Sequence, residues 1–163
     1  MTNAAADVAR ELSALVRDTA PALERIGESG SRADRGPGTW SRKQVLGHVI
    51  DSAVNNLHRF VRAQQGDELL FPDYDQPHWV AAGGYQDRPW SSLVDLWSHL
   101  NAHLAEVMAR IPAERLEVTC RIGDSQPLSL EFIVRDYLRH LRHHLGQILD
   151  PDAAARKTHP PFP

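Results

Sequence analysis

The sequence predicts an all-α protein built as a four-helix bundle. Apolar residues recur at three- and four-residue steps along four long segments, which is the period of an amphipathic helix. The segments between them are rich in Gly, Pro and Ser, which favour turns and loops. At 163 residues, the chain is long enough for one domain with a single core. We expect the bundle to occupy residues 1–150 and residues 151–163 to form an irregular C-terminal tail.

Composition and charge exclude several classes of protein. Hydrophobic residues make up 42% of the chain and charged residues 24%, as in water-soluble globular proteins. The net charge of −3 and the scattered basic residues argue against a nucleic-acid partner. No apolar run approaches the ~18 residues of a membrane span, and the N-terminus lacks the pattern of a signal peptide. Cys120 is the only cysteine, so we expect a cytoplasmic protein without an internal disulfide.

The first two helices are predicted from their apolar faces. Residues 4–27 carry an apolar stripe at helical period, and Pro21 within it is expected to kink or split the helix. Residues 27–38 are predicted to form a loop. Ser41 and Gln44 form the pattern of a capping box at the start of the second helix, for which Gly66 is a plausible stop.

The second helix also has a polar face, and its environment decides what it does. It is formed by Gln44, His48, Asp51, Ser52, Asn55 and Arg59. Such a stripe is either a solvated surface or the lining of a polar cleft between helices. Spacing alone does not distinguish the two.

The remaining elements follow from turn residues and caps. Residues 66–90 form a long aromatic connection with a short helix predicted near 75–81. The third helix is expected to begin at Ser91 or Ser92 and to end by Pro112. Residues 116–128 are predicted as a small hairpin or an extended crossing. Ser129 then caps the fourth helix, which runs to Asp150.

Histidines spaced four apart are the main chemical signal. On the fourth helix, the imidazoles of His140 and His144 lie one turn apart on one side, where they can bind one metal ion with a third ligand from elsewhere. His48 is the best candidate for that ligand. His99 and His103 on the third helix form a rival pair, so the spacing by itself is a weak signal. His143 points about 100° away from His144.

Three sequence blocks carry a resemblance to a known family. They read Trp40-Ser-x-x-Gln-Val-Leu-Gly-His48-Val-Ile-Asp51-Ser52, Tyr74-Asp75-x-x-x-Trp79 and Tyr137-x-x-His140-x-x-His143-His144-x-x-x-Ile148. Each block alone is degenerate, but the three together, in this order and at these separations, are fairly specific. The chain resembles the DinB/YfiT-like family of metal-dependent enzymes over roughly residues 8–150.

The resemblance implies a fold, a metal site and two reaction classes. The fold is a four-helix bundle of up-down-down-up arrangement with a long loop between the second and third helices. His48, His140 and His144 would hold a divalent metal, zinc or nickel, while His99 and His103 fall outside the family pattern. The implied activities on small molecules are hydrolysis and S-transfer with a low-molecular-weight thiol such as bacillithiol or mycothiol. The family also often forms homodimers.

Further roles are hypotheses built on these ligands. Three imidazoles leave an open coordination position, which is typical of catalytic rather than structural zinc sites. Asp51 and Asp136 are the candidate catalytic carboxylates, placed to orient an imidazole N–H, although either could be an ordinary surface carboxylate. Tyr74, Asp75 and Trp79 are the candidate substrate-binding residues, as a pocket wall or lid. Alternatively, the tryptophan plugs the end of the bundle.

A second hypothesis belongs to another class of function. The chain would be a non-catalytic helical bundle in which the metal is structural or sensory, or in which a dimer is the working unit. This hypothesis predicts that no accessible coordination position lies beside the histidines.

Overall fold

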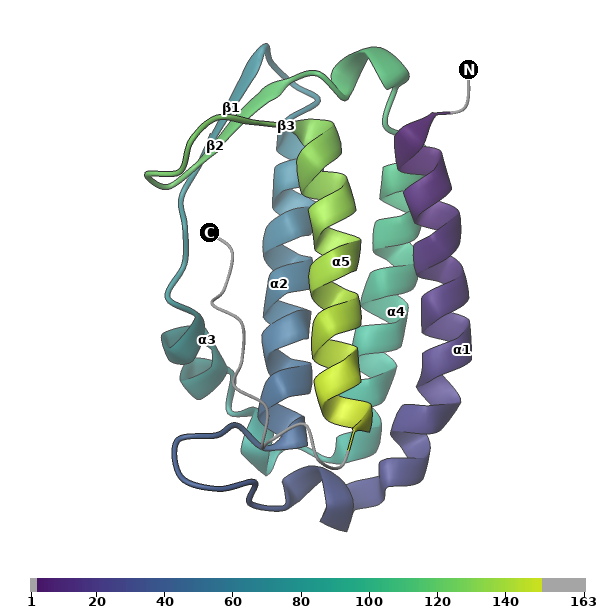
Figure 1. The fold of residues 1–163 in the computed structure, drawn as a ribbon, viewed down its shortest axis with the longest axis vertical. Helices are drawn as coiled ribbons and strands as arrows, with labels where there is room; N and C mark the ends of the chain where they lie inside the picture. Colours follow the sequence, from purple (N-terminus) through teal and green to yellow (C-terminus); the bar gives the residue numbers. More distant parts are fainter. Residues whose placement is uncertain (1–2, 151–163) are drawn as a thin grey trace.

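Four long helices form one bundle in the computed structural model, which describes residues 3–150. They are α1 (Ala4–Arg32), α2 (Arg42–Arg62), α4 (Trp90–Ala109) and α5 (Leu130–Leu149). Helices α1 and α2 both pack against α4 and α5. Figure 1 shows α2 and α4 running in one direction and α1 and α5 in the other. The four-helix bundle and its up-down-down-up arrangement are therefore confirmed.

Because α2 and α4 are parallel, the chain between them must return along the length of the bundle. This crossover contains strand β1 (Glu68–Phe71), helix α3 (Gln76–Gly83) and the 3₁₀ turn η1 (Tyr85–Asp87). The predicted short helix is confirmed. Asp75 caps it by accepting a hydrogen bond from the amide of His78. The crossover places α3 and η1 beside the first half of α2 (Figure 1).

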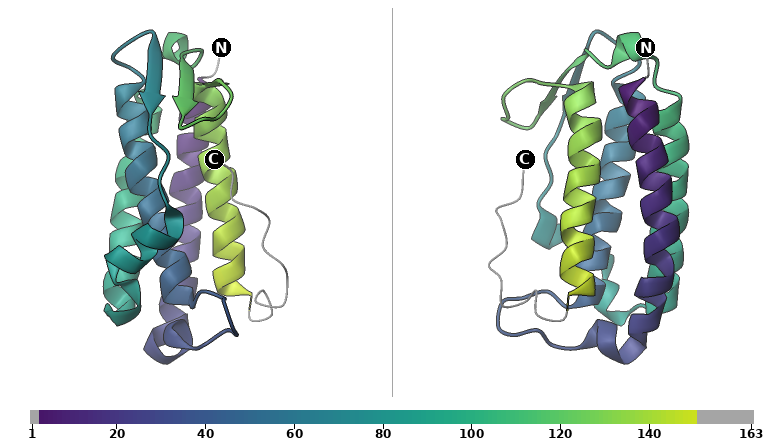
Figure 2. Two further views of the ribbon diagram at one scale, coloured as in Figure 1. Left: turned by 90° about the vertical axis from the view of Figure 1, so that its left-hand side faces the viewer. Right: turned by 45° about the vertical axis from the view of Figure 1, so that its right-hand side comes forward.

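A small sheet lies at the end of the bundle where α2 ends and α5 begins (Figure 2). After the 3₁₀ turn η2 (Ala113–Arg115), β2 (Thr119–Ile122) pairs antiparallel with β3 (Leu128–Ser129), as the predicted hairpin requires. Strand β2 also pairs in parallel with β1, with Leu69 opposite Cys120. The sequence analysis missed β1, because its partner lies about fifty residues further along the chain.

The core is made from the apolar stripes that the sequence shows. Each long helix contributes side chains that are at most 1% exposed, among them Leu12, Leu46, Trp97, Leu104 and Leu141. Burial of a large apolar side chain of this kind contributes about 1.5–3 kcal/mol. The periodicity of the sequence thus identifies most of the residues that form the core, whereas on α2 the polar face is buried as well.

Two predicted helix starts are confirmed, and a third differs. Ser41 and Gln44 form the expected capping box on α2, and the Ser129 hydroxyl accepts a hydrogen bond from the amide of Phe132 on α5. Helix α4 begins at Trp90, before the expected serines. The amide of Trp90 donates to the carboxylate of Glu28 in α1, 2.8 Å away. A neighbouring helix therefore satisfies a donor that a local serine would otherwise cap.

One predicted helix end was wrong, and the kink expected in the first helix lies at a different residue. Helix α2 ends at Arg62 rather than near Gly66, because the amides of Gln64 and Gln65 already form tight turns to the carbonyls three residues before them. Helix α1 continues to Arg32, and its non-helical residue is Gly27, with φ 68°, rather than Pro21. Proline keeps a helical φ, whereas a positive φ takes the chain out of the helix and suits glycine.

Candidate metal centre

Helices α2 and α5 bring three histidines together. The Nε2 atoms of His48 and His140 lie 3.3 Å apart, and those of His140 and His144 lie 3.0 Å apart. One ring nitrogen from each of the three lies within 4.8 Å of the other two. Within residues 3–150, these side chains form the one group of three or more His, Cys, Asp or Glu residues with this geometry. The sequence-predicted trio therefore meets in space.

The spacing of the three nitrogens fits a metal ion. A tetrahedral ion with Zn–N bonds of about 2.0–2.1 Å holds its nitrogen ligands about 3.3 Å apart. The observed separations of 3.3 and 3.0 Å are close to this value. A neutral imidazole carries only one N–H, so a ring that holds its proton on Nδ1 presents the lone pair of Nε2, which a cation can bind. Imidazole nitrogen is a common ligand of zinc, copper, iron and nickel.

Burial keeps these imidazoles neutral. His48 is 1% exposed, while His140 and His144 are partly buried. Burial, with a smaller repulsion from His144, lowers the pKa of His48 to about 3. Burial and the neighbouring histidines likewise lower the pKa of His140 to about 3. Burial lowers the pKa of His144 to about 4. Near pH 7 all three rings are therefore unprotonated on one nitrogen, as metal ligation requires.

Gln147 orients one of the three rings. Its Oε1 atom lies 2.8 Å from Nδ1 of His144, three residues earlier on α5. With the amide in this orientation, His144 donates from Nδ1 and keeps the lone pair of Nε2 for the cluster. The sequence analysis missed this role, although a spacing of three residues on a helix is a signal that could have revealed it.

A tyrosine of the crossover packs against two glycines, one of which precedes His48. A Cβ atom at Gly47 would lie 2.0 Å from Cδ2 of Tyr85, and one at Gly83 would lie 2.5 Å from its Cε2. The ring of Tyr85 therefore occupies the space where those side chains would be. Its hydroxyl donates a hydrogen bond to Asp51 of α2. This packing attaches the crossover to α2 one residue before His48.

The two candidate catalytic carboxylates make their hydrogen bonds elsewhere. Asp51 accepts from Tyr85, and burial raises its pKa to about 6. Asp136 accepts from Nε of Arg139 at 2.9 Å. Among the described residues, Gln147, rather than either carboxylate, has a hydrogen bond to an imidazole of the trio.

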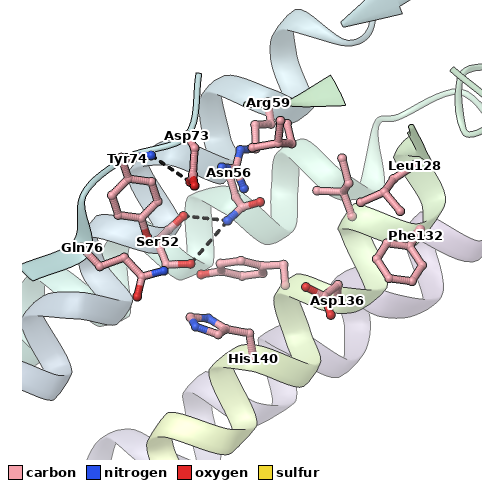
Figure 3. Close-up of a pocket in the computed structure, with 13 residues that line it drawn as sticks. Ser52, Asn56, Arg59, Asp73, Tyr74, Gln76, Leu128, Phe132, Asp136 and His140 are labelled. Carbon is pink, nitrogen blue, oxygen red and sulfur yellow. Dashed lines mark hydrogen bonds between the residues drawn. The ribbon is translucent and has the colours of Figure 1, made fainter. Parts of the chain in front are cut away.

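A pocket adjoins the histidines, and His140 forms part of its wall (Figure 3). The other lining residues come from α2, the crossover, the small sheet and α5, and they are Ser52, Asn56, Arg59, Asp73, Tyr74, Gln76, Ile122, Leu128, Phe132, Ile133, Asp136 and Tyr137. Ser52 and Arg59 on the polar face of α2 line this pocket. Of its other members, His48, Asp51 and Asn55 are buried, so the face is not a solvated surface. The sequence analysis noted Ser52 and Arg59 on that face but gave them no function.

The three candidate substrate-binding residues occupy different positions. Tyr74 lines the pocket, and burial raises its pKa to about 12. Its ring packs against that of Trp79, with ring centroids 5.3 Å apart, so Trp79 supports the pocket wall from behind. Asp75 caps α3 and is not among the lining residues.

Among the described residues, three other histidines that the sequence singles out lie outside the trio. His99 and His103 are both exposed on α4. His143 is exposed as well, and its ring lies beside that of His144, with centroids 5.1 Å apart.

Comparison with known proteins identifies a family and agrees with the fold. A family model described as the DinB superfamily matches residues 6–148. The chain belongs to the DinB superfamily. YfiT from Bacillus subtilis, described as "a probable metal-dependent hydrolase with an unusual four-helix bundle topology", has a similar fold. The TM-score is 0.74 at 20% sequence identity, and the match covers 93% of this chain and 85% of YfiT.

Several sequence relatives of this DinB-superfamily chain bear the name "putative metal-dependent hydrolase". One from Halalkalibacterium halodurans is 24% identical over 110 residues, and one from Bacillus cereus is 29% identical over 111 residues. A third, from Oceanobacillus iheyensis, is 24% identical over 111 residues. Each match covers 68% of this chain but only 64% of the relative's length.

In the described part of the chain, no helix is long and apolar enough to cross a membrane.

Proposed function

We propose that this DinB-superfamily protein is a metal-dependent hydrolase of a small-molecule substrate. It would hold a zinc or nickel ion through His48, His140 and His144. The observation that carries the proposal is the convergence of three neutral imidazoles, with Nε2 atoms 3.3 and 3.0 Å apart. The hydrolase names of the sequence relatives give it independent support.

The surroundings of the trio favour catalysis over a structural metal. A structural zinc site is normally closed by four protein ligands, whereas three ligands leave one position for water or substrate. His140 belongs both to the trio and to the pocket wall, so a molecule in the pocket would lie beside the cluster. This arrangement argues against the non-catalytic bundle.

The chain's own residues would position the reactants. A bound divalent ion supplies Lewis acidity that activates water and polarises a substrate carbonyl. Gln147 fixes the tautomer of His144, and the ring of Trp40 packs against that of His48, with centroids 5.4 Å apart. Asp136 and Tyr74 face the pocket and are the groups placed to contact a substrate. Asp51 positions the crossover through Tyr85.

Hydrolysis is the preferred reaction class, and thiol transfer is the runner-up. Cys120 is buried, and burial raises the pKa of its thiol to about 11, so it is a poor nucleophile near pH 7. A thiol-dependent transferase would therefore need a low-molecular-weight thiol as cosubstrate.

The homodimer and the cytoplasmic location stay predictions. Light scattering on the purified chain tests whether it forms a homodimer.

Elemental analysis of the protein purified without a His tag or chelator tests the metal site. We expect about one zinc or nickel ion per chain and its loss in His140→Ala. The double variant His99→Ala/His103→Ala is the matched control, since it removes a pair of the same spacing from an exposed face. Metal-dependent hydrolysis of a panel of esters and amides then tests the reaction class. A wild-type protein that takes up neither zinc nor nickel would refute the proposal.

A further inference from the structure

Arg59 is a buried cation that has no counter-ion within residues 3–150. Its side chain is 6% exposed and lines the pocket from α2. Its Nε and Nη2 atoms are fully buried and lack a hydrogen-bond partner among the described residues, where the guanidinium also forms no ion pair. The guanidinium lies over the ring of Phe71, whose centroid is 5.6 Å from Cζ. An arginine stays protonated, so this burial is unfavourable unless an anion joins it.

The nearby carboxylates do not fill this role. Asp73 and Asp136 also line the pocket and influence Arg59 only at longer range. Asp136 is paired with Arg139, and Asp73 accepts a hydrogen bond from the amide of Tyr74 at 2.8 Å. Their negative charge also limits what can bind, because a dianion such as phosphate would be repelled more strongly than a monoanion.

The pocket extends from Arg59 to the histidine trio. Figure 3 shows Arg59 and His140 on opposite sides of it, with Ser52 and Asn56 between them. His140 follows Phe132 by eight positions on α5, and this spacing corresponds to a distance of about 12 Å along the helix axis. Leu128 and Phe132 form an apolar wall that faces Ser52 and Gln76 across the pocket (Figure 3).

We propose that Arg59 binds the carboxylate of the substrate, so that the enzyme acts on small monocarboxylic acids with an apolar body. The planar guanidinium offers two parallel N–H donors, which match the two oxygens of a carboxylate. The apolar wall receives the hydrocarbon part, and the reacting bond then points toward the trio. This assignment rests on the proposed hydrolase function.

Binding of simple acids tests the carboxylate site without any turnover. Acetate, hexanoate and benzoate are titrated into the full chain, both zinc-loaded and metal-depleted, while the ¹⁵N–¹H signal of Arg59 Nε is followed by NMR. Hexanoate is expected to bind at least ~10-fold more tightly than neutral hexanamide or inorganic phosphate. Arg59→Gln should weaken hexanoate binding by ~10- to 100-fold. Arg62→Gln is the control, because Arg62 is exposed on the same helix.

Stability measurements separate a ligand-binding arginine from a structural one. Arg59→Met keeps much of the side-chain volume but removes the unpaired charge, so it should unfold at the same or a higher temperature than wild type without ligand. Added hexanoate should raise the unfolding temperature of wild type and leave that of Arg59→Met unchanged. An Arg59→Met protein that melts well below wild type would show a structural role and overturn the inference.

The outcomes also separate this inference from the proposed function. Zinc uptake together with hexanoate binding that depends on Arg59 supports both. Zinc uptake without Arg59-dependent binding of any of the three acids overturns the carboxylate site and leaves the hydrolase proposal standing. Arg59-dependent binding in a protein that takes up neither zinc nor nickel refutes the hydrolase and retains an anion site.

Discussion

Two pairs of histidines with the same spacing lie in very different surroundings. His140 and His144 on α5 are partly buried and face His48 across the interface with α2. His99 and His103 on α4 are also four residues apart, but both are exposed. The helix geometry is identical, and the difference lies in what faces each pair. Two histidines four residues apart on a helix can supply two ligands. A metal site also needs a third ligand, which here comes from the neighbouring helix α2.

Burial explains why only one pair is prepared to bind a metal ion. Desolvation lowers the pKa of His140 to about 3 and that of His144 to about 4, so these rings present lone pairs far below neutral pH. The packing of α2 against α5 also fixes the rings before an ion arrives. An exposed pair must lose side-chain entropy to adopt one geometry.

The largest expected effect is the loss of one ligand from the buried pair. His144→Ala should lower zinc affinity by more than ~100-fold, because altering a residue that only supports a ligand already costs 10–100-fold. His103→Ala should leave the affinity unchanged. Competition with a chelating dye measures both values. Equal affinities for the two variants would mean that the buried trio is not the metal site.

A smaller effect is expected from the residue that orients His144. Gln147→Ala removes the partner of Nδ1 and should lower zinc affinity by ~10- to 100-fold. Gln147→Glu restores an acceptor and should recover most of that loss. The same dye competition measures these affinities, and an unaffected Gln147→Ala protein would assign the orientation of the ring to packing alone.

Alanine substitutions at two glycines on the helices of the trio test how tightly each position is packed. Gly47→Ala would place a Cβ atom 2.0 Å from Tyr85, so the ring or the helix must shift, at a cost of about 1–3 kcal/mol. Gly146→Ala, on α5, meets nothing within 4 Å and should stabilise the helix by up to about 1 kcal/mol. Urea unfolding monitored by circular dichroism measures the free energy of unfolding of both variants. We expect it to fall in Gly47→Ala and to rise in Gly146→Ala.

The smallest effect is a pH dependence from Asp51. Burial raises its pKa from 3.8 to about 6, so the folded state binds more protons than the unfolded state between these values. The contribution of this group to stability therefore falls as the pH rises from about 4 to 6. The free energy of unfolding of Asp51→Asn relative to wild type should rise by about 1–2 kcal/mol from pH 4 to pH 7. This is below the ceiling of about 3 kcal/mol that the pKa shift sets.

An exposed carboxylate provides the control for this dependence. Asp95 precedes His99 by four residues on the open face of α4, and Asp95→Asn should show no such change relative to wild type. Urea titrations at pH 4, 5, 6 and 7 measure all three proteins. A flat difference between Asp51→Asn and wild type would contradict the raised pKa.

The sequence by itself determined the bundle, the apolar faces that form its core and the caps that begin α2 and α5. These features depend on local physics, since apolar period and side-chain caps act within a few residues. It also indicated the ligand trio, because His140 and His144 share one turn and the resemblance supplied His48. Gln147 was within reach of the same reasoning, three residues after His144.

Only the tertiary structure decided what the polar face of α2 does. The same residues would suit a solvated surface, and the packing of the crossover, the small sheet and α5 turns them into a cleft. The start of α4 at Trp90 likewise depends on Glu28, 62 residues earlier. The unpaired charge of Arg59 is visible only there, because burial and the absence of a partner among the described residues are properties of packed neighbours and not of spacing along one helix.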